Sequence, residues 1–270
     1  MKLSNIFSTN VKLPVEIIFQ GGLGSQLVSY ASYLYLRDSG KEVYCDLSYY
    51  HENKPSIAEP GEGVSFWKYE LDSYGIDIES LIVKPENIQV KRLDDEEEKF
   101  ILFSESLKNL NLKEIFKISE DQKNIYEEIL KKNNIEKEKL ICVHIRRGDY
   151  LNVASHIVKD EEFIGILEKF SGILDSLLIF SDSKISKSIK EVGKDNFKNF
   201  VFLDQNDVNA INVHNIMRKA RILVASNSTF SLTAGLLNKN IILIPKTWYG
   251  SGRQDGLNDM LSKLGNFSLI

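Results

Sequence analysis

Residues 141–150 read ICVHIRRGDY, and this stretch sets the fold class. The run 140–145 is almost wholly apolar, which predicts a strand that is covered on both faces of its sheet. The run ends abruptly at Arg146 and Arg147, and Asp149 follows two residues later. Because neighbouring side chains of an extended chain point to opposite sides, one arginine can face a ligand while the other is tied to a carboxylate such as Asp149.

An arginine at the carboxyl end of a buried strand suits a phosphate group, because the guanidinium donates hydrogen bonds in a fixed plane and keeps its charge. The alternative is an ordinary surface ion pair between an arginine and Asp149, since such pairs are common and weak. The sequence around this strand leaves both interpretations open.

Apolar and amphipathic segments alternate from about residue 119 onward. The expected helices cover 120–132, 160–170, 184–192, 207–219 and 229–237, and the expected strands cover 177–180, 200–203, 222–225 and 241–244. Such alternation predicts a parallel sheet with right-handed crossovers, whose ligands bind beyond the carboxyl ends of the strands. The polar residues expected at those ends are Arg146, Arg147, Asp182, Asp204, Ser226, Asn227 and Ser228.

The turn at Ser226, Asn227, Ser228 and Thr229 opens the helix expected at 229–237. Serine, asparagine and threonine are standard N-cap residues, so the turn has a purely structural interpretation. The same free N–H groups and hydroxyls would also hold a diphosphate. Asp182 has a similar choice between capping the next helix and accepting hydrogen bonds from a ribose or a base.

A second strand–turn–helix unit lies near the N-terminus, with strands expected at 15–19 and 43–47 and a glycine-rich turn at 20–26. A helix beginning at about Gln26 would place its N-terminus beside this turn and favour an anion. The turn is neither the dinucleotide fingerprint, because Leu27 stands where the third glycine belongs, nor a Walker A loop. A tight turn between strand and helix without a ligand is the alternative. Residues 48–75 are irregular, and their aromatic side chains either face a sugar or pack the loop onto the core.

Composition narrows the functional classes. The formal net charge is -4, which argues against nucleic-acid binding, and a hydrophobic content of 43% is ample for a core. Cys45 and Cys142 are the two cysteines, and both are expected to be reduced core residues of a cytoplasmic protein. We expect neither a signal peptide nor a membrane span, and contact with the inner face of a membrane stays open. No acidic or cysteine pattern of a metal site occurs, so we expect no metal and no cofactor.

Five motifs, taken in order, resemble those of glycosyltransferase family 11, the α-1,2-fucosyltransferases of bacterial type. They are the stretches 21–27 (GGLGSQL), 144–150 (HIRRGDY), 180–183 (FSDS), 226–231 (SNSTFS) and 244–249 (IPKTWY). The resemblance implies a GT-B-like α/β fold of two Rossmann-like halves, with parallel sheets facing a central cleft. It implies an acceptor-side domain over 1–118 and a nucleotide-sugar-binding domain over 119–250. We expect the tail at 251–270 to pack back on the N-terminal half.

The resemblance also implies roles for individual residues. Arg146 would bind the β-phosphate of guanosine diphosphate (GDP), and His144 would lie near the nucleotide. The expected donor-binding residues are Gly22, Gly24, Gln26, His144, Arg146, Arg147, Asp182, Asn227, Ser228 and Thr229. The expected catalytic residues are Arg146, Asp149 and His156, where Asp149 and His156 are alternative candidates for the general base.

The implied activity is an inverting, metal-independent transfer of L-fucose from GDP-fucose to a galactoside hydroxyl of a bacterial surface glycan such as O-antigen. The acceptor would be an oligosaccharide or a lipid-linked glycan. Ser183, Leu232 and Thr233 depart from the family pattern. The alternatives are therefore another GDP-linked deoxysugar, such as colitose, or a non-catalytic protein of the same fold that binds a glycan or a nucleotide. The alternation and the glycine turn by themselves also allow a dinucleotide oxidoreductase.

Overall fold

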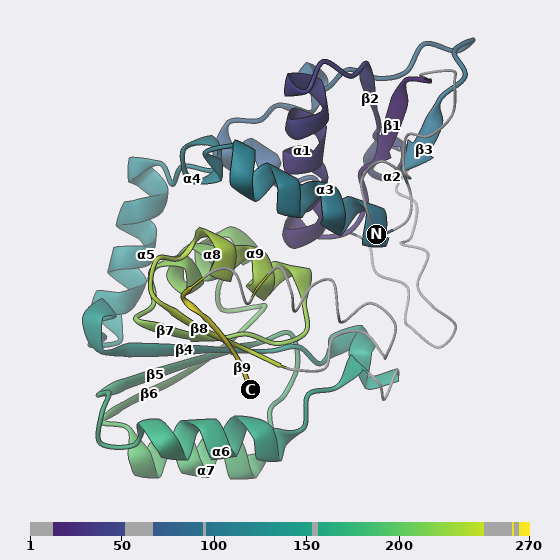
Figure 1. Cartoon of the computed structure of the whole chain (residues 1–270). Coiled ribbons are helices and arrows are strands. Elements are labelled where there is room, and N and C mark those ends of the chain that lie inside the picture. The colour runs from purple at the N-terminus through teal and green to yellow at the C-terminus, as the bar shows by residue number, and fades with distance from the viewer. Residues whose placement is uncertain (1–12, 52–66, 94–95, 153–155, 246–260, 262–264) are drawn as a thin grey trace. The chain divides into compact units, whose positions relative to one another are not determined.

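The structure is a computed structural model of the chain, and it describes residues 13–51, 67–93, 96–152, 156–245, 261 and 265–270. The chain forms two compact units, of which the first ends at Lys117 and the second begins at Ile118. Each unit is built on its own parallel sheet (Figure 1). This is the α/β class with two Rossmann-like units that the sequence predicts.

Six strands form the sheet of the second unit, in the order β6-β5-β4-β7-β8-β9, and all neighbours are parallel. Their bounds are β4 Leu140–Ile145, β5 Ser176–Ser181, β6 Asn199–Asp204, β7 Ile222–Val224, β8 Ile241–Ile244 and β9 Phe267–Leu269. Counted along the chain, this is the doubly wound order 3-2-1-4-5-6. The order reverses between β4 and β7, so the topological switch point lies beside β4, the strand that precedes the two arginines.

Every residue of β4 is buried, as the apolar run predicts. Ile141, Val143 and Ile145 belong to a hydrophobic core that continues into β5, β7 and the helices α6 and α7. Cys142 is a free, buried cysteine of the same strand, and burial raises the pKa of its thiol to about 12. The strand is therefore a rigid support for whatever follows Ile145.

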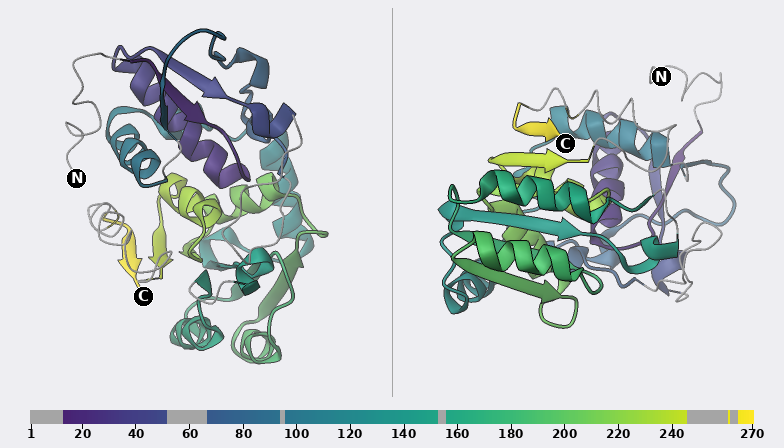
Figure 2. Two further views of the ribbon diagram at one scale, coloured as in Figure 1. Left: turned by 90° about the vertical axis from the view of Figure 1, so that its right-hand side faces the viewer. Right: turned by 90° about the horizontal axis from the view of Figure 1, so that it is seen from below.

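Helices cover both faces of this sheet. They are α5 Glu120–Lys132, α6 Asp160–Phe170, α7 Lys187–Asn196, α8 Ala210–Lys219 and α9 Thr229–Leu237, with the short helices η4 Lys137–Lys139 and η5 Gly148–Asn152. α6 and α7 lie together on one face, while α8 and α9 lie on the other (Figures 1 and 2). Three of the five long helices begin and end where the sequence predicts, and α5 begins with a capping box between Ser119 and Gln122.

The first unit holds a three-stranded parallel sheet in the order β2-β1-β3. Its elements are β1 Val15–Ile18, α1 Leu23–Asp38, β2 Val43–Asp46, α2 Ser48–His51, η2 Leu71–Tyr74, η3 Ile78–Ser80, β3 Lys91–Leu93, α3 Glu96–Asn109 and α4 Leu112–Ile115. α1 packs against α3 and against both β1 and β2. The glycine-rich turn follows the central strand of this sheet, at its carboxyl end.

The structure adds elements that the sequence did not predict. The tail at 251–270 is described only at Leu261 and 265–270, where Phe267–Leu269 is β9 and pairs with β8 at the edge of the second sheet. Three residues are too few to show a strand period in the sequence. The expected packing of the tail on the N-terminal half stays a prediction. Residues 76–118 hold the strand β3 and the 14-residue helix α3, and not only short helices.

Candidate active site at the switch point

The ends of β4 and β7 are joined at the switch point. The backbone N–H of Arg146 donates a hydrogen bond to Ser226 Oγ over 3.3 Å. The backbone N–H of Ser226 donates in turn to Ser231 Oγ over 3.2 Å, and the Ser231 hydroxyl lies 3.2 Å from the Ser226 carbonyl. The strand that carries the arginine is thus fixed to the first turn of α9.

The side chain of Arg146 lies in a largely enclosed setting at this point, with 14% of it exposed. Its Nη1 forms an ion pair with Asp182 Oδ2, and its guanidinium lies over the ring of Tyr150, 5.0 Å from the ring centroid. Asp182 follows β5, so the pair joins the carboxyl ends of adjacent strands. The guanidinium is held in place by a carboxylate on one side and an aromatic face on the other.

Arg147 is held in a different way. Its backbone N–H donates to Asp182 Oδ1 over 2.7 Å, and its guanidinium forms an ion pair with Asp160 at the start of α6 and lies over the ring of Phe163. The two-sided arrangement expected of adjacent arginines is present, and the carboxylate that holds the second arginine is Asp160. The side chain of Asp149, which the sequence suggested for this role, lies outside the described part of the chain.

Gly148 fits beside this cluster because it has no side chain. Its φ is +24°, and a Cβ atom on it would lie 2.6 Å from Asp182 Oδ2. His156, the second candidate for the general base, is buried, and its ring packs edge-on against Tyr150 at a centroid distance of 5.0 Å. Tyr150 therefore contacts both Arg146 and His156. The sequence assigns no role to this tyrosine.

The serine-rich turn combines a structural role with unused polar groups. Ser228 is the N-cap of α9, and its side chain accepts a hydrogen bond from the N–H of Phe230. Thr229 is the first residue of the helix, and its carbonyl accepts from the Thr233 hydroxyl over 2.8 Å. Asn227 is 1% exposed, and its Oδ1 has no hydrogen-bond partner among the described residues. A buried amide oxygen without a donor is a group that a ligand or an ordered water would satisfy.

His144 lies on β4 behind this turn and is uncharged. Its ring stacks on Phe180 and meets Phe230 edge-on, at centroid distances of 5.9 and 5.4 Å. Burial, helped by the charge of Arg146, lowers its pKa to about 3. His214 on α8 is also buried, with a pKa well below 6.5, and its Nε2 lies 3.1 Å from Thr233 Oγ1. Thr233, which departs from the family pattern, is thus a hydrogen-bond partner of the neutral His214.

The glycine-rich turn of the first unit is tied down by its own unit. The Gln26 side chain donates to the carbonyls of Gly21 and Lys68 and accepts from the N–H of Glu70. The carboxylate of Glu70 accepts from the N–H of Leu23, the first residue of α1, over 3.1 Å. The anion expected at this helix N-terminus is therefore a side chain of the protein. As donor-binding residues, Gly22, Gly24 and Gln26 stay predictions.

Aromatic side chains gather around the same turn. Tyr50 donates its hydroxyl proton to the Gly21 carbonyl, and its ring lies against those of Tyr49 and Tyr69. A Cβ atom on Gly22 would lie 3.0 Å from the ring of Trp67. These contacts favour the packing interpretation of the residues that follow β2. Phe66 and the rest of 52–66 lie outside the described residues.

Glu70 and Asp160 complete these contacts although the sequence suggested no role for them. Ser226 is expected at a strand end, but not as the acceptor of the Arg146 N–H. Glu70 lies 47 residues from its partner in the chain, and Arg146 lies 80 residues from Ser226. No pattern within a short stretch of sequence predicts pairs that are so far apart along the chain. Within the described ranges no group of three His, Cys, Asp or Glu residues could hold a metal ion, and no described helix is long and apolar enough to cross a membrane.

Comparison with known proteins identifies the family. Residues 96–263, more than half of the chain, match the family described as Glycosyl transferase family 11. The chain belongs to glycosyl transferase family 11. The match spans the arginine motif and the serine-rich turn, and it confirms the resemblance seen in the motifs. Membership makes the protein a glycosyltransferase.

Solved structures show the same fold. A structure of POFUT1 in complex with GDP has a TM-score of 0.51 and 11% identity, and the match covers 87% of this chain and 99% of that one. The ADP-heptose lps heptosyltransferase II of E. coli has a TM-score of 0.50 and 8% identity, with 96% of this chain and 90% of that one covered. These likenesses support the GT-B-like fold class. No curated protein sequence matches the chain.

Proposed function

We propose that this family 11 protein transfers L-fucose from GDP-fucose to a galactoside hydroxyl, with inversion and without a metal, to form an α-1,2 linkage. The observation that carries the proposal is the cationic group at the switch point, where Arg146 is fixed beside the N-terminal turn of α9. Nucleotides bind at such switch points, and helix N-termini favour phosphate. POFUT1, whose fold the chain shares, was solved with GDP.

In the proposed reaction an acceptor oxygen attacks C1 of the sugar, and the bond between C1 and the diphosphate oxygen breaks. Negative charge then develops on the leaving diphosphate. The Arg146 guanidinium, together with the positive end of the α9 dipole and the Ser228 and Thr229 hydroxyls at the start of that helix, would stabilise that charge. Asn227 offers its amide at the same turn.

The acceptor hydroxyl must lose its proton during the attack. Asp149 and His156 are the candidate bases, because both follow the arginine motif closely. A base has to come within about 3 Å of the attacking oxygen. His144 is unsuited to this role because its pKa of about 3 leaves it a weak base. We assign it to the wall behind the nucleotide.

The proposed context is the synthesis of a bacterial surface glycan such as O-antigen, on an oligosaccharide or lipid-linked acceptor and in contact with the inner face of the membrane. Another GDP-linked deoxysugar, such as colitose, is the alternative donor. Direct comparison of purified GDP-sugars, with the linkage read from the nuclear magnetic resonance (NMR) spectrum of the product, separates the two donors.

Calorimetric titration with GDP in the presence of EDTA tests the donor assignment. We expect the wild type to bind, and Arg146→Ala to lose about 2 kcal/mol of binding free energy, as for the loss of one charged hydrogen-bond partner. Arg221→Ala is the matched control, since Arg221 is exposed and precedes β7 at the opposite end of the strand. A wild type that does not bind GDP would remove the donor and the fucosyl assignment together.

A further inference from the structure

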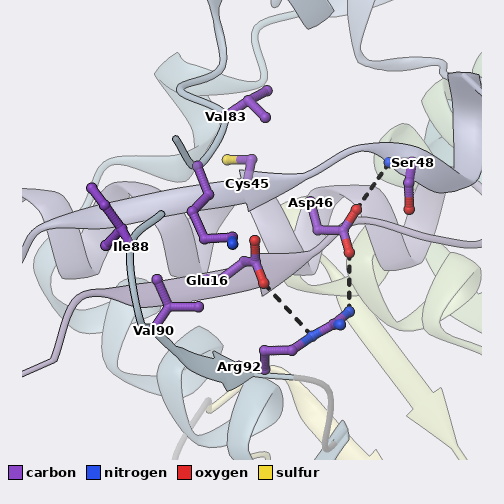
Figure 3. A pocket seen from close by; sticks show the side chains of 9 residues that line it. Glu16, Cys45, Asp46, Ser48, Val83, Ile88, Val90 and Arg92 are labelled. Carbon is purple, nitrogen blue, oxygen red and sulfur yellow. Dashed lines mark hydrogen bonds and ion pairs between the residues drawn. The ribbon is translucent and has the colours of Figure 1, made fainter. Parts of the chain in front are cut away.

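A cavity of about 550 Å³ lies in the first unit, and none of the residues assigned to the donor lines it (Figure 3). It is lined by β1, β2 and β3 and by the segment 83–90. All of its lining residues are within one unit and within the described ranges. Its volume falls in the range of roughly 300–1,000 Å³ that small-molecule sites occupy.

The floor of the cavity is a buried carboxylate. The side chain of Glu16, on the central strand β1, is 8% exposed, and its closest cation is Arg92 Nε at 3.6 Å. That separation is an ion pair and is too long for a hydrogen bond. From the described residues no hydrogen bond reaches this carboxylate. Because no described donor occupies its lone pairs, Glu16 is a ready acceptor for a donor group in the cavity.

Arg92 is held in place beside Glu16. It lies in register with Glu16 on the adjacent strand β3, and its Nη2 donates to Asp46 Oδ2 over 3.0 Å. Asp46 Oδ1 accepts from the N–H of Ser48, so this carboxylate is fixed as well. The Arg92 side chain is still 55% exposed, which leaves part of its guanidinium accessible. Figure 3 shows the Arg92 guanidinium joined to both carboxylates, Glu16 and Asp46.

The segment 83–90 adds one more cation and three apolar side chains to the lining. Lys84 lines the cavity and forms no ion pair with a described carboxylate, and Val83, Ile88 and Val90 line it beside Lys84. Two carboxylates and two cations make the lining formally neutral. An ionic ligand would therefore gain little from it overall.

We propose that this cavity is a saccharide subsite that holds a neutral sugar residue of the acceptor glycan. A sugar hydroxyl donates to Glu16, other hydroxyls accept from Arg92 and Lys84, and the C–H face of the ring packs on Val83, Ile88 and Val90. A sugar alternates donors, acceptors and C–H groups over a short distance, and the lining does the same. The proposal rests on the proposed function, because it assumes that the protein binds a glycan acceptor.

NMR titration of the protein with N-acetyllactosamine, in the absence of a GDP-sugar, tests the subsite directly. We expect saturable shifts of the backbone amides of β1, β2 and β3 in the wild type. Glu16→Gln should weaken this binding about tenfold, as for one charge-assisted hydrogen bond. Glu98→Gln is the matched control, because Glu98 pairs with Lys91 in the same unit and does not line the cavity.

Lys84→Ala is the second variant, since it changes the wall of the cavity and leaves the sheet intact. It should also weaken N-acetyllactosamine binding, and all variants should bind GDP as the wild type does. Absence of shifts in the three strands, or equal binding by the wild type and both variants, would overturn the subsite while GDP binding still supported the donor site. Preferential binding of a zwitterionic amino acid such as glycine would overturn the saccharide assignment. Loss of GDP binding by the wild type would overturn the proposed function instead.

Discussion

The N–H of Arg146 and the hydroxyl of Ser226 meet across the switch point, 3.3 Å apart, and tie the end of β4 to the end of β7. Ser226 is fully buried and also donates its own N–H to Ser231 Oγ. One short network therefore sets both the position of the arginine backbone and the first turn of α9. The two groups proposed to hold a diphosphate are placed by the same serine.

Ser226→Ala should disturb the protein more than a simple capping change. It leaves the Arg146 N–H without this acceptor, and we expect a loss of about 1–3 kcal/mol in the free energy of unfolding. GDP affinity should fall in the same variant. Ser186→Ala is the control: Ser186 caps α7 through the Ile189 N–H, so its loss should cost about 1 kcal/mol and leave GDP affinity unchanged. Urea unfolding and calorimetry measure both effects, and equal GDP affinity in Ser226→Ala and wild type would contradict the linkage.

Asp182→Asn tests the carboxylate that serves both arginines. An asparagine oxygen can still accept the Arg147 N–H, but it cannot pair with the Arg146 charge. We expect a loss of about 2 kcal/mol in the free energy of unfolding, because the pair is largely buried. Asp175→Asn removes an exposed partner of Lys139 and should cost under about 1 kcal/mol. A similar small cost for both variants would show that Asp182 contributes no more than a surface ion pair.

Gly148→Ala should be among the most damaging single-atom additions in the second unit. The new methyl group would lie 2.6 Å from Asp182 Oδ2 in a backbone with φ of +24°. Gly172→Ala carries the strain of a positive φ of +73° alone, since a Cβ atom there meets nothing within 4 Å. We expect the free energy of unfolding to fall by about 1 kcal/mol in Gly172→Ala and by clearly more in Gly148→Ala, as measured by thermal and urea unfolding. Equal losses would mean that Asp182 moves aside freely.

The stability of the protein should fall on acidification through the pH range between 6.5 and 3. His144 has a pKa of about 3 in the folded chain and an ordinary value of 6.5 when unfolded, so below pH 6.5 the unfolded state takes up the proton first. Each such histidine lowers the free energy of unfolding by up to about 1.4 kcal/mol for every pH unit of acidification in this range. Above pH 6.5 its contribution is constant.

His214 has a pKa lowered in the same direction, so the two histidines act together. His144→Gln should remove one of the two contributions and flatten the dependence of unfolding free energy on pH. His51→Gln, at an exposed position on α2, is the control substitution of the same kind. An unaltered slope in His144→Gln would show that His144 does not drive the acid response.

The sequence predicts the secondary structure of this protein better than it predicts the contacts of the candidate site. The bounds of α5, α6, α9 and β8 follow from apolar periodicity and capping residues, because these are properties of short stretches of chain. The partners of the arginines could not be read in this way. Arg147 pairs with Asp160 and Arg146 with Asp182, neither of which is a near neighbour in sequence, because crossovers bring other strand and helix ends to this point.

The first unit shows the same limit at α1. The sequence places the start of this helix near Gln26, but it begins at Leu23 with no side-chain cap from its own N-cap residue Gly22. The carboxylate of Glu70, from a segment 47 residues away, takes over that role. Long-range caps of this kind leave no local signature, so the start of the helix was predicted three residues late.

Glu70→Gln should stabilise the protein at neutral pH. Burial raises the pKa of this carboxyl above its ordinary value of 4.5, against a smaller opposing effect of the Leu23 N–H. The folded state therefore holds the proton more readily than the unfolded state, and the contribution of Glu70 is favourable below pH 4.5 and is lost as pH rises through the raised pKa. A glutamine oxygen can accept the same N–H bond without carrying a buried charge.

The free energy of unfolding of Glu70→Gln should exceed that of the wild type at pH 7 and not at pH 4. Glu70→Ala removes the hydrogen bond from the Leu23 N–H, and its free energy of unfolding should fall by about 1 kcal/mol at both pH values. A less stable Glu70→Gln at pH 7 would mean that the negative charge itself, through its attraction to the N-terminus of α1, outweighs its burial.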